Sequence, residues 1–68
     1  MNIDIRKNVT NNFKGNNSEE VISSIDMAID SKDELVLPGL GVLLELAWKS
    51  LSKEEQEKFA SLVIKNIQ

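Results

Sequence analysis

The chain contains no cysteine and no histidine, and its 68 residues include one proline, three glycines, one tryptophan and no tyrosine. Without cysteine no disulfide can form, and without cysteine or histidine the usual zinc sites are excluded. The same absences remove the serine–histidine and cysteine–histidine pairs used by most nucleophilic hydrolases. We therefore expect a protein that is not an enzyme. Its stability has to come from helix packing or from association with another chain.

Long hydrophobic runs are also missing. The opening segment Met1–Lys7 lacks the apolar stretch of a signal peptide. The longest apolar region, residues 35–48, is interrupted by one proline, two glycines and Glu45, and it is too short to span a bilayer. We expect a soluble, cytosolic protein with no membrane partner.

The net charge of −3 is unevenly distributed along the chain. Residues 1–17 carry three positive side chains against one negative, whereas residues 18–34 carry six negative side chains against one positive. The basic side chains of the first segment are Arg6, Lys7 and Lys14. Because duplex affinity comes mainly from neutralised phosphates, an acidic chain with one mildly basic end is poorly suited to coating DNA.

The spacing of apolar residues predicts a helix from about residue 3 to residue 13, followed by three more helices. Ile5, Val9 and Phe13 recur every four residues and so share one helical face. Gly15 follows as a left-handed stop, because glycine adopts positive φ at little cost. Many of the intervening residues are weak helix formers, so this first helix needs tertiary support.

Capping boxes mark the starts of the second and fourth helices. Asn17 with Glu20 predicts a helix that ends near Ser31, and Ser52 with Glu55 predicts the last helix. The second helix repeats apolar residues at helical spacing from Val21 to Ile29. On the fourth helix, the residues expected to be buried are Phe59, Leu62, Val63 and Ile67.

The third helix is predicted to start at Pro38, since proline suits the first helical position. Its apolar residues cover most of its circumference and leave only Glu45 and Lys49 as a polar strip. Such a helix belongs in the middle of a bundle or at a subunit interface. The sequence therefore predicts a single all-α domain over residues 1–68, a compact array of about four short helices around a central apolar helix.

Nothing in the chain predicts a catalytic, cofactor-binding, metal-binding or small-molecule site. The paired carboxylates stand at helix starts or in a polar turn, where capping and solvation account for them. Gly39 and Gly41 lack the lysine and hydroxyl partner of a phosphate loop. The apolar turn into the third helix suggests a docking surface. Its candidate residues are Leu37, Pro38, Gly39, Leu40, Val42 and Leu46.

The string from Leu37 to Glu45, LPGLGVLLE, resembles the central signature of the minor small acid-soluble spore proteins of type I from endospore-forming Firmicutes. The similarity continues outward in order, through the opening IDIRKNV, the KGNNSEE turn, Ile29-Asp30-Ser31, Leu46-Ala47-Trp48 and the lysine- and glutamate-rich last helix. Residues 32–36 depart from the family by being more apolar and acidic.

This resemblance implies a protein of the forespore and dormant spore core, distinct from the abundant α/β-type spore proteins that coat DNA. It carries over no catalytic or binding residue and no cofactor. We therefore expect a non-catalytic protein that acts through contacts with itself or with an unidentified spore protein. Two alternatives stay open: weak DNA association through Arg6, Lys7 and Lys14, and a stored polypeptide consumed on germination.

Overall fold

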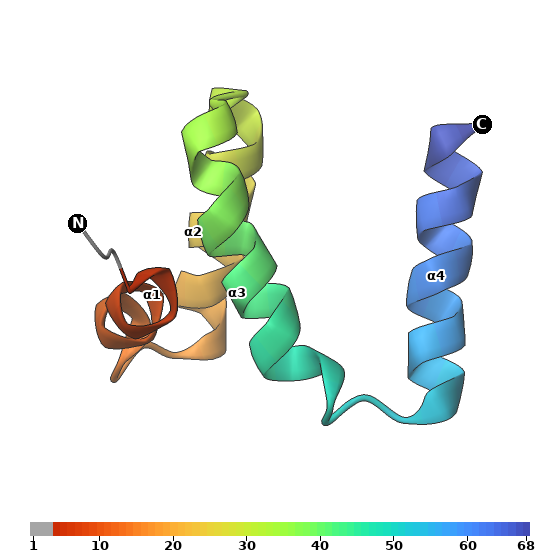
Figure 1. Cartoon of the computed structure of the whole chain (residues 1–68), viewed down its shortest axis with the longest axis horizontal. Coiled ribbons are helices and arrows are strands. Elements are labelled where there is room, and N and C mark those ends of the chain that lie inside the picture. The colour runs from red at the N-terminus through yellow and green to blue at the C-terminus, as the bar shows by residue number, and fades with distance from the viewer. Residues whose placement is uncertain (1–3) are drawn as a thin grey trace.

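The computed structural model describes residues 4–68, and within that range it contains helices and no strands (Figure 1). The predicted all-α class is confirmed. Ile3, which was expected to open the first helix, lies outside the described residues. The elements in chain order are α1 (Ile5–Phe13), α2 (Ser18–Ser31), the short 3-10 helix η1 (Glu34–Val36), α3 (Leu37–Trp48) and α4 (Lys53–Ile67).

The two capping boxes predicted from the sequence are confirmed. At the start of α2 the backbone N–H of Glu20 donates to Asn17 Oδ1 over 2.9 Å, and the N–H of Asn17 donates back to Glu20 Oε1 over 3.3 Å. At the start of α4 the N–H of Glu55 donates to Ser52 Oγ, and the N–H of Ser52 donates to Glu55 Oε1. Each box gives partners to backbone donors that a helix start would otherwise leave unpaired.

The other helix boundaries match the sequence prediction in part. Gly15 adopts φ +84° after α1, as expected for a left-handed stop. Asp4 caps α1 by accepting from the N–H of Lys7, and Lys32 ends α2 with φ 54°; neither was predicted. The turn η1 was also missed, and α3 starts at Leu37, one residue before Pro38.

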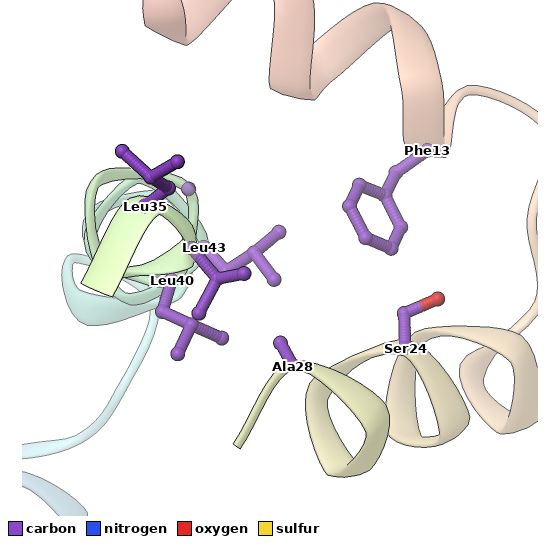
Figure 2. A pocket seen from close by; sticks show the side chains of 8 residues that line it. Phe13, Ser24, Ala28, Leu35, Leu40 and Leu43 are labelled. Atoms are coloured by element: carbon purple, nitrogen blue, oxygen red, sulfur yellow. The ribbon is translucent and has the colours of Figure 1, made fainter. Parts of the chain in front are cut away.

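The packed part of the molecule is formed by α1, α2, η1 and α3. Val42 on α3 is buried, with 7% of its surface exposed, and α1 packs closely against α3. Val9 of α1 lies against the start of α3, since a Cβ atom at Gly39 would be 3.7 Å from Val9 Cγ2, an ordinary contact distance. The inner faces of α1, α2 and α3 surround an apolar crevice of about 200 Å³ (Figure 2).

Helix α4 stands apart from this packed part, joined to α3 by residues 49–52 (Figure 1). Its interactions with α3 lie near the connection: the rings of Trp48 and Phe59 meet edge to face with centroids 5.6 Å apart, and Gln56 Nε2 donates to the Trp48 carbonyl over 3.0 Å. Beyond the residues that make these contacts, α4 diverges from α3 (Figure 1).

The prediction that α4 buries its apolar face within the chain was therefore wrong. Val63 is 44% exposed and Ile67 is 76% exposed, and Phe59 and Leu62 are exposed as well. The expected compact array is not formed either, because the connection directs α4 away from α1 and α2. The radius of gyration is 13.3 Å, compared with about 11 Å for a compact domain of this length.

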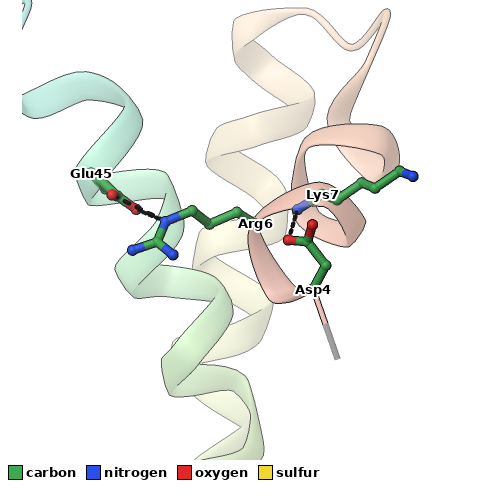
Figure 3. Close-up of polar contacts among 4 residues, drawn as sticks. All are labelled: Asp4, Arg6, Lys7 and Glu45. Atoms are coloured by element: carbon green, nitrogen blue, oxygen red, sulfur yellow. Dashed lines mark hydrogen bonds and ion pairs between the residues drawn. The ribbon is translucent and has the colours of Figure 1, made fainter. Parts of the chain in front are cut away.

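An ion pair joins α1 to α3 on the surface (Figure 3). Arg6 Nε lies 2.8 Å from Glu45 Oε2 and 3.1 Å from Glu45 Oε1. The hydrogen bond and the charge of Glu45 raise the pKa of Arg6, and the hydrogen bond from Arg6 lowers the pKa of Glu45. The partner of Glu45 is thus Arg6, which lies 39 residues away in the sequence.

No helix among residues 4–68 combines the length and the apolar character needed to cross a membrane.

Removing the Asn17 cap tests the local stabilisation of α2. Asn17→Ala should lower the free energy of unfolding by about 1 kcal/mol, because the N–H of Glu20 loses its acceptor. Urea denaturation followed by circular dichroism measures this. Asn16→Ala is the matched control. Asn16 lies in the same turn and takes part through its backbone N–H, which donates to the Phe13 carbonyl and is kept in the variant. Equal losses in both variants would contradict the capping role.

Truncating Val42 tests where the core lies. Val42→Ala should cost about 2 kcal/mol of unfolding free energy, because methyl groups are removed from a closed site. Leu46→Ala removes a larger but exposed side chain from the same helix, and should cost less than about 1 kcal/mol. Chemical denaturation of both variants gives the comparison, and a larger cost at Leu46 would show that the exposed side of α3 is covered in solution.

The Arg6–Glu45 pair predicts a dependence of stability on acid. Because the pKa of Glu45 is lowered in the folded chain, the pair contributes stability above the ordinary value of 4.5, and this contribution is lost as the pH falls through the folded pKa. The melting temperature of Glu45→Gln should therefore lie below that of the unmodified chain at neutral pH and converge with it in acid. Glu57→Gln, on α4, is the control. A difference in melting temperature that does not change with pH would exclude the pair as its source.

Candidate interaction surface

The six residues proposed from the sequence as a docking surface do not lie on one face of the structure. Leu37, Pro38 and Leu46 are exposed, whereas Val42 is buried. The remaining two, Gly39 and Leu40, line the crevice enclosed by α1, α2 and α3. The group therefore divides between the outside of α3 and the interior.

The crevice itself is formed by apolar side chains from several elements. Figure 2 shows Phe13 from α1 and Ala28 and Ser24 from α2 facing Leu40 and Leu43 of α3. None of its eight lining residues has an ionisable side chain, and Ser24 supplies the single hydroxyl. General acid–base chemistry needs a titratable group within reach, and the lining of this crevice contains none.

A second hollow, of about 380 Å³, lies where α3 and α4 diverge. Its apolar lining comes from Leu44 and Trp48 of α3 and from Phe59 of α4, and Gly41 leaves its side open. The charged side chains of Glu45 and Lys49 complete the lining. The hollow thus combines an apolar interior with a few charged groups, as protein–protein interfaces do.

Exposed apolar residues continue from this hollow along both helices. On α3, positions 37, 41, 44 and 48 follow the four–three–four spacing of a coiled-coil seam. On α4, positions 59, 63 and 67 repeat every four residues and so lie along one side of the helix. We call this set the open face. Its residues are Leu37, Gly41, Leu44, Trp48, Phe59, Val63 and Ile67.

The sequence predicts a buried face on α4 that includes Phe59 and Val63, and it places α3 either in the middle of a bundle or at a subunit interface. The structure leaves Leu44, Trp48, Phe59 and Val63 partly exposed. One signal did point to this outcome: α3 has too little polar surface to cover itself in so short a chain. What could not be read from the sequence is the direction in which α4 leaves α3.

The charged groups of residues 4–68 that make defined contacts do so in helix caps and ion pairs. Among residues 4–68, no three acidic side chains come together in a way that could hold a metal ion. The carboxylates with altered pKa values are Glu45, which is paired with Arg6, and Glu55, whose pKa is lowered by hydrogen bonds from Ser52. Of the three candidate nucleic-acid contacts, Arg6 is engaged with Glu45, while Lys7 and Lys14 are exposed.

Comparison with known proteins gives consistent matches. The family model for small, acid-soluble spore protein I matches residues 3–67. The small, acid-soluble spore protein I of Halalkalibacterium halodurans is 35% identical over 68 residues, covering all of both chains. That of Bacillus subtilis is 41% identical over 58 residues, covering 85% of this chain and 82% of the relative. That of Bacillus cytotoxicus is 41% identical over 56 residues, covering 82% and 80%.

No solved structure matches the chain significantly. The assignment consequently depends on the sequence matches, which extend over nearly the whole chain and include the LPGLGVLLE string at the start of α3. The chain belongs to the small, acid-soluble spore protein I family.

Proposed function

We propose that this chain is a non-catalytic protein of the forespore and spore core that acts through protein–protein contacts, in the first place with a second copy of itself. The family supplies the setting, because its members are spore proteins by name. The open face supplies the mode of action, because the chain's own fold leaves its apolar side chains exposed.

The observation that carries the proposal is the exposure of apolar residues along both α3 and α4. Side chains such as Leu37 and Ile67 are more than half exposed on helices that adjoin the same hollow. Scattered apolar side chains are normal on a protein surface, but a continuous apolar face with charged groups beside it marks a site of association.

The titratable groups support a non-catalytic role. The pKa of Glu45 and that of Glu55 are both lowered, so both carboxylates remain ionised near neutral pH and are occupied in an ion pair and a helix cap. A general acid or base works best with a pKa close to the operating pH. Histidine, which most often fills that role, is absent from the chain.

The DNA alternative has weaker support. It relies on Arg6, Lys7 and Lys14, and the Arg6 guanidinium is already held by Glu45 across 2.8 Å. The stored-polypeptide alternative requires no defined structure, and the two complete capping boxes argue for a chain selected to fold.

Sedimentation equilibrium and duplex binding together test the proposal. We expect the purified chain to associate reversibly at micromolar concentration, with a mass rising from 7.6 kDa towards twice that value. A fluorescent generic duplex titrated with the chain at low salt should show little change in anisotropy, and the Arg6→Ala/Lys7→Ala variant should behave in the same way.

A strict monomer up to high micromolar concentration would exclude self-association. Duplex binding that weakens steeply with salt and disappears in the Arg6→Ala/Lys7→Ala variant would instead favour the spore-nucleoid function. A monomer without duplex binding would leave storage as the better account.

A further inference from the structure

We infer that two copies of the chain interlock, with α4 of each copy lying on the open face of the other, between its α3 and its α4. The four helices would then form a bundle related by a two-fold axis. This inference rests on the proposed self-association and specifies its geometry, with α4 of a second copy as the occupant of the hollow.

The exposed area of the chain matches the area that such a dimer needs. The chain exposes 6109 Å², whereas a compact monomer of 7.6 kDa exposes about 4,300 Å². The excess is about 1,800 Å² for each copy, or about 3,600 Å² for two copies, which falls within the range of obligate homodimer interfaces. Each copy therefore exposes, beyond the area of a compact monomer, about as much surface as one copy buries in a permanent dimer.

The position of α4 is held by defined interactions in the connection. The N–H of Ser50 donates to the Ala47 carbonyl over 3.0 Å, and the N–H of Leu51 donates to the Trp48 carbonyl over 3.2 Å. Gln56 donates to the same Trp48 carbonyl from the first turn of α4. These bonds keep α4 diverging from α3, so that its apolar side is presented to a second chain.

Gly41 provides an independent indication of a close partner. Glycine inside a helix is unfavourable, and Gly41 lies within α3. A Cβ atom at Gly41 would meet nothing within 4 Å, so the chain's own packing does not require glycine there. Gly41 lines the hollow, and a missing side chain at that point lets a second helix approach the α3 backbone closely.

The charges on α4 permit such pairing. The helix carries three lysines, at positions 53, 58 and 65, against three glutamates, at positions 54, 55 and 57. Its formal net charge is zero, so two α4 helices can lie close together without net repulsion. Its apolar residues Phe59, Val63 and Ile67 would contact the apolar residues of α3.

Engineered cysteines test the geometry directly, because the chain has none of its own. The Leu44→Cys variant and the Val63→Cys variant are mixed, refolded together and oxidised. We expect a disulfide-linked product of twice 7.6 kDa that contains one copy of each variant, resolved by mass spectrometry. The control pairs Val63→Cys with Ile22→Cys, an exposed position on α2, and should give little product.

A second variant separates association from folding. Gly41→Leu should leave the helical circular dichroism signal intact, because the chain has open space there, but weaken dimerisation at least tenfold by blocking the approach of the partner. Ser61→Leu adds the same side chain on the opposite side of α4 and should leave the dimer unchanged. The fluorescence of Trp48, the single tryptophan, reports the covering of the open face.

The outcomes distinguish this geometry from self-association in general. A dimer that persists in Gly41→Leu and gives no Leu44–Val63 cross-link between chains would overturn the interlocked arrangement while leaving self-association standing. An efficient disulfide within one chain of a Leu44→Cys/Val63→Cys double variant would show that α4 closes on its own α3. A strict monomer would overturn both proposals.

Discussion

The structure depends on one constraint: α3 is apolar around most of its circumference, and within residues 4–68 the other elements cover mainly one side of it. Helices α1 and α2 and the turn η1 pack against the side that carries Val42, Leu40 and Leu43. Within residues 4–68, the side that carries Leu37, Leu44 and Trp48 stays partly exposed and contacts α4 near its start. A chain of 68 residues has too little length to enclose a helix of this kind by itself.

The interactions that define each helix are local, and those that define the tertiary structure are few. Asp4, Asn17, Asp33 and Ser52 each accept a backbone hydrogen bond from a residue two or three positions along the chain. Long-range interactions include the packing of α1 against α3 and the ion pair between Arg6 and Glu45. The ion pair links α1 to α3. Because both of its side chains are exposed, it contributes little to the free energy of unfolding.

This division explains what the sequence could predict. The caps at Asn17 and Ser52 and the stop at Gly15 follow from short-range chemistry, and they were predicted correctly. Helix α4 was correctly predicted as a helix, but its apolar side was assigned to the interior, because periodicity identifies an apolar side without identifying what covers it. The partner of Glu45 was missed for a related reason: sequence spacing indicates neighbours within one helix and says nothing about Arg6 on another.

The separation of local from long-range interactions has a consequence for the order of folding. Because the caps are complete within single segments, each helix can form before the helices meet, on the fast time scale of local contacts. The slow step is then the encounter of preformed helices, and in the proposed dimer α4 meets its neighbours on a second chain. Its rate would rise with protein concentration, so the amount of protein made, as well as its sequence, would determine how quickly the last part of the structure is completed.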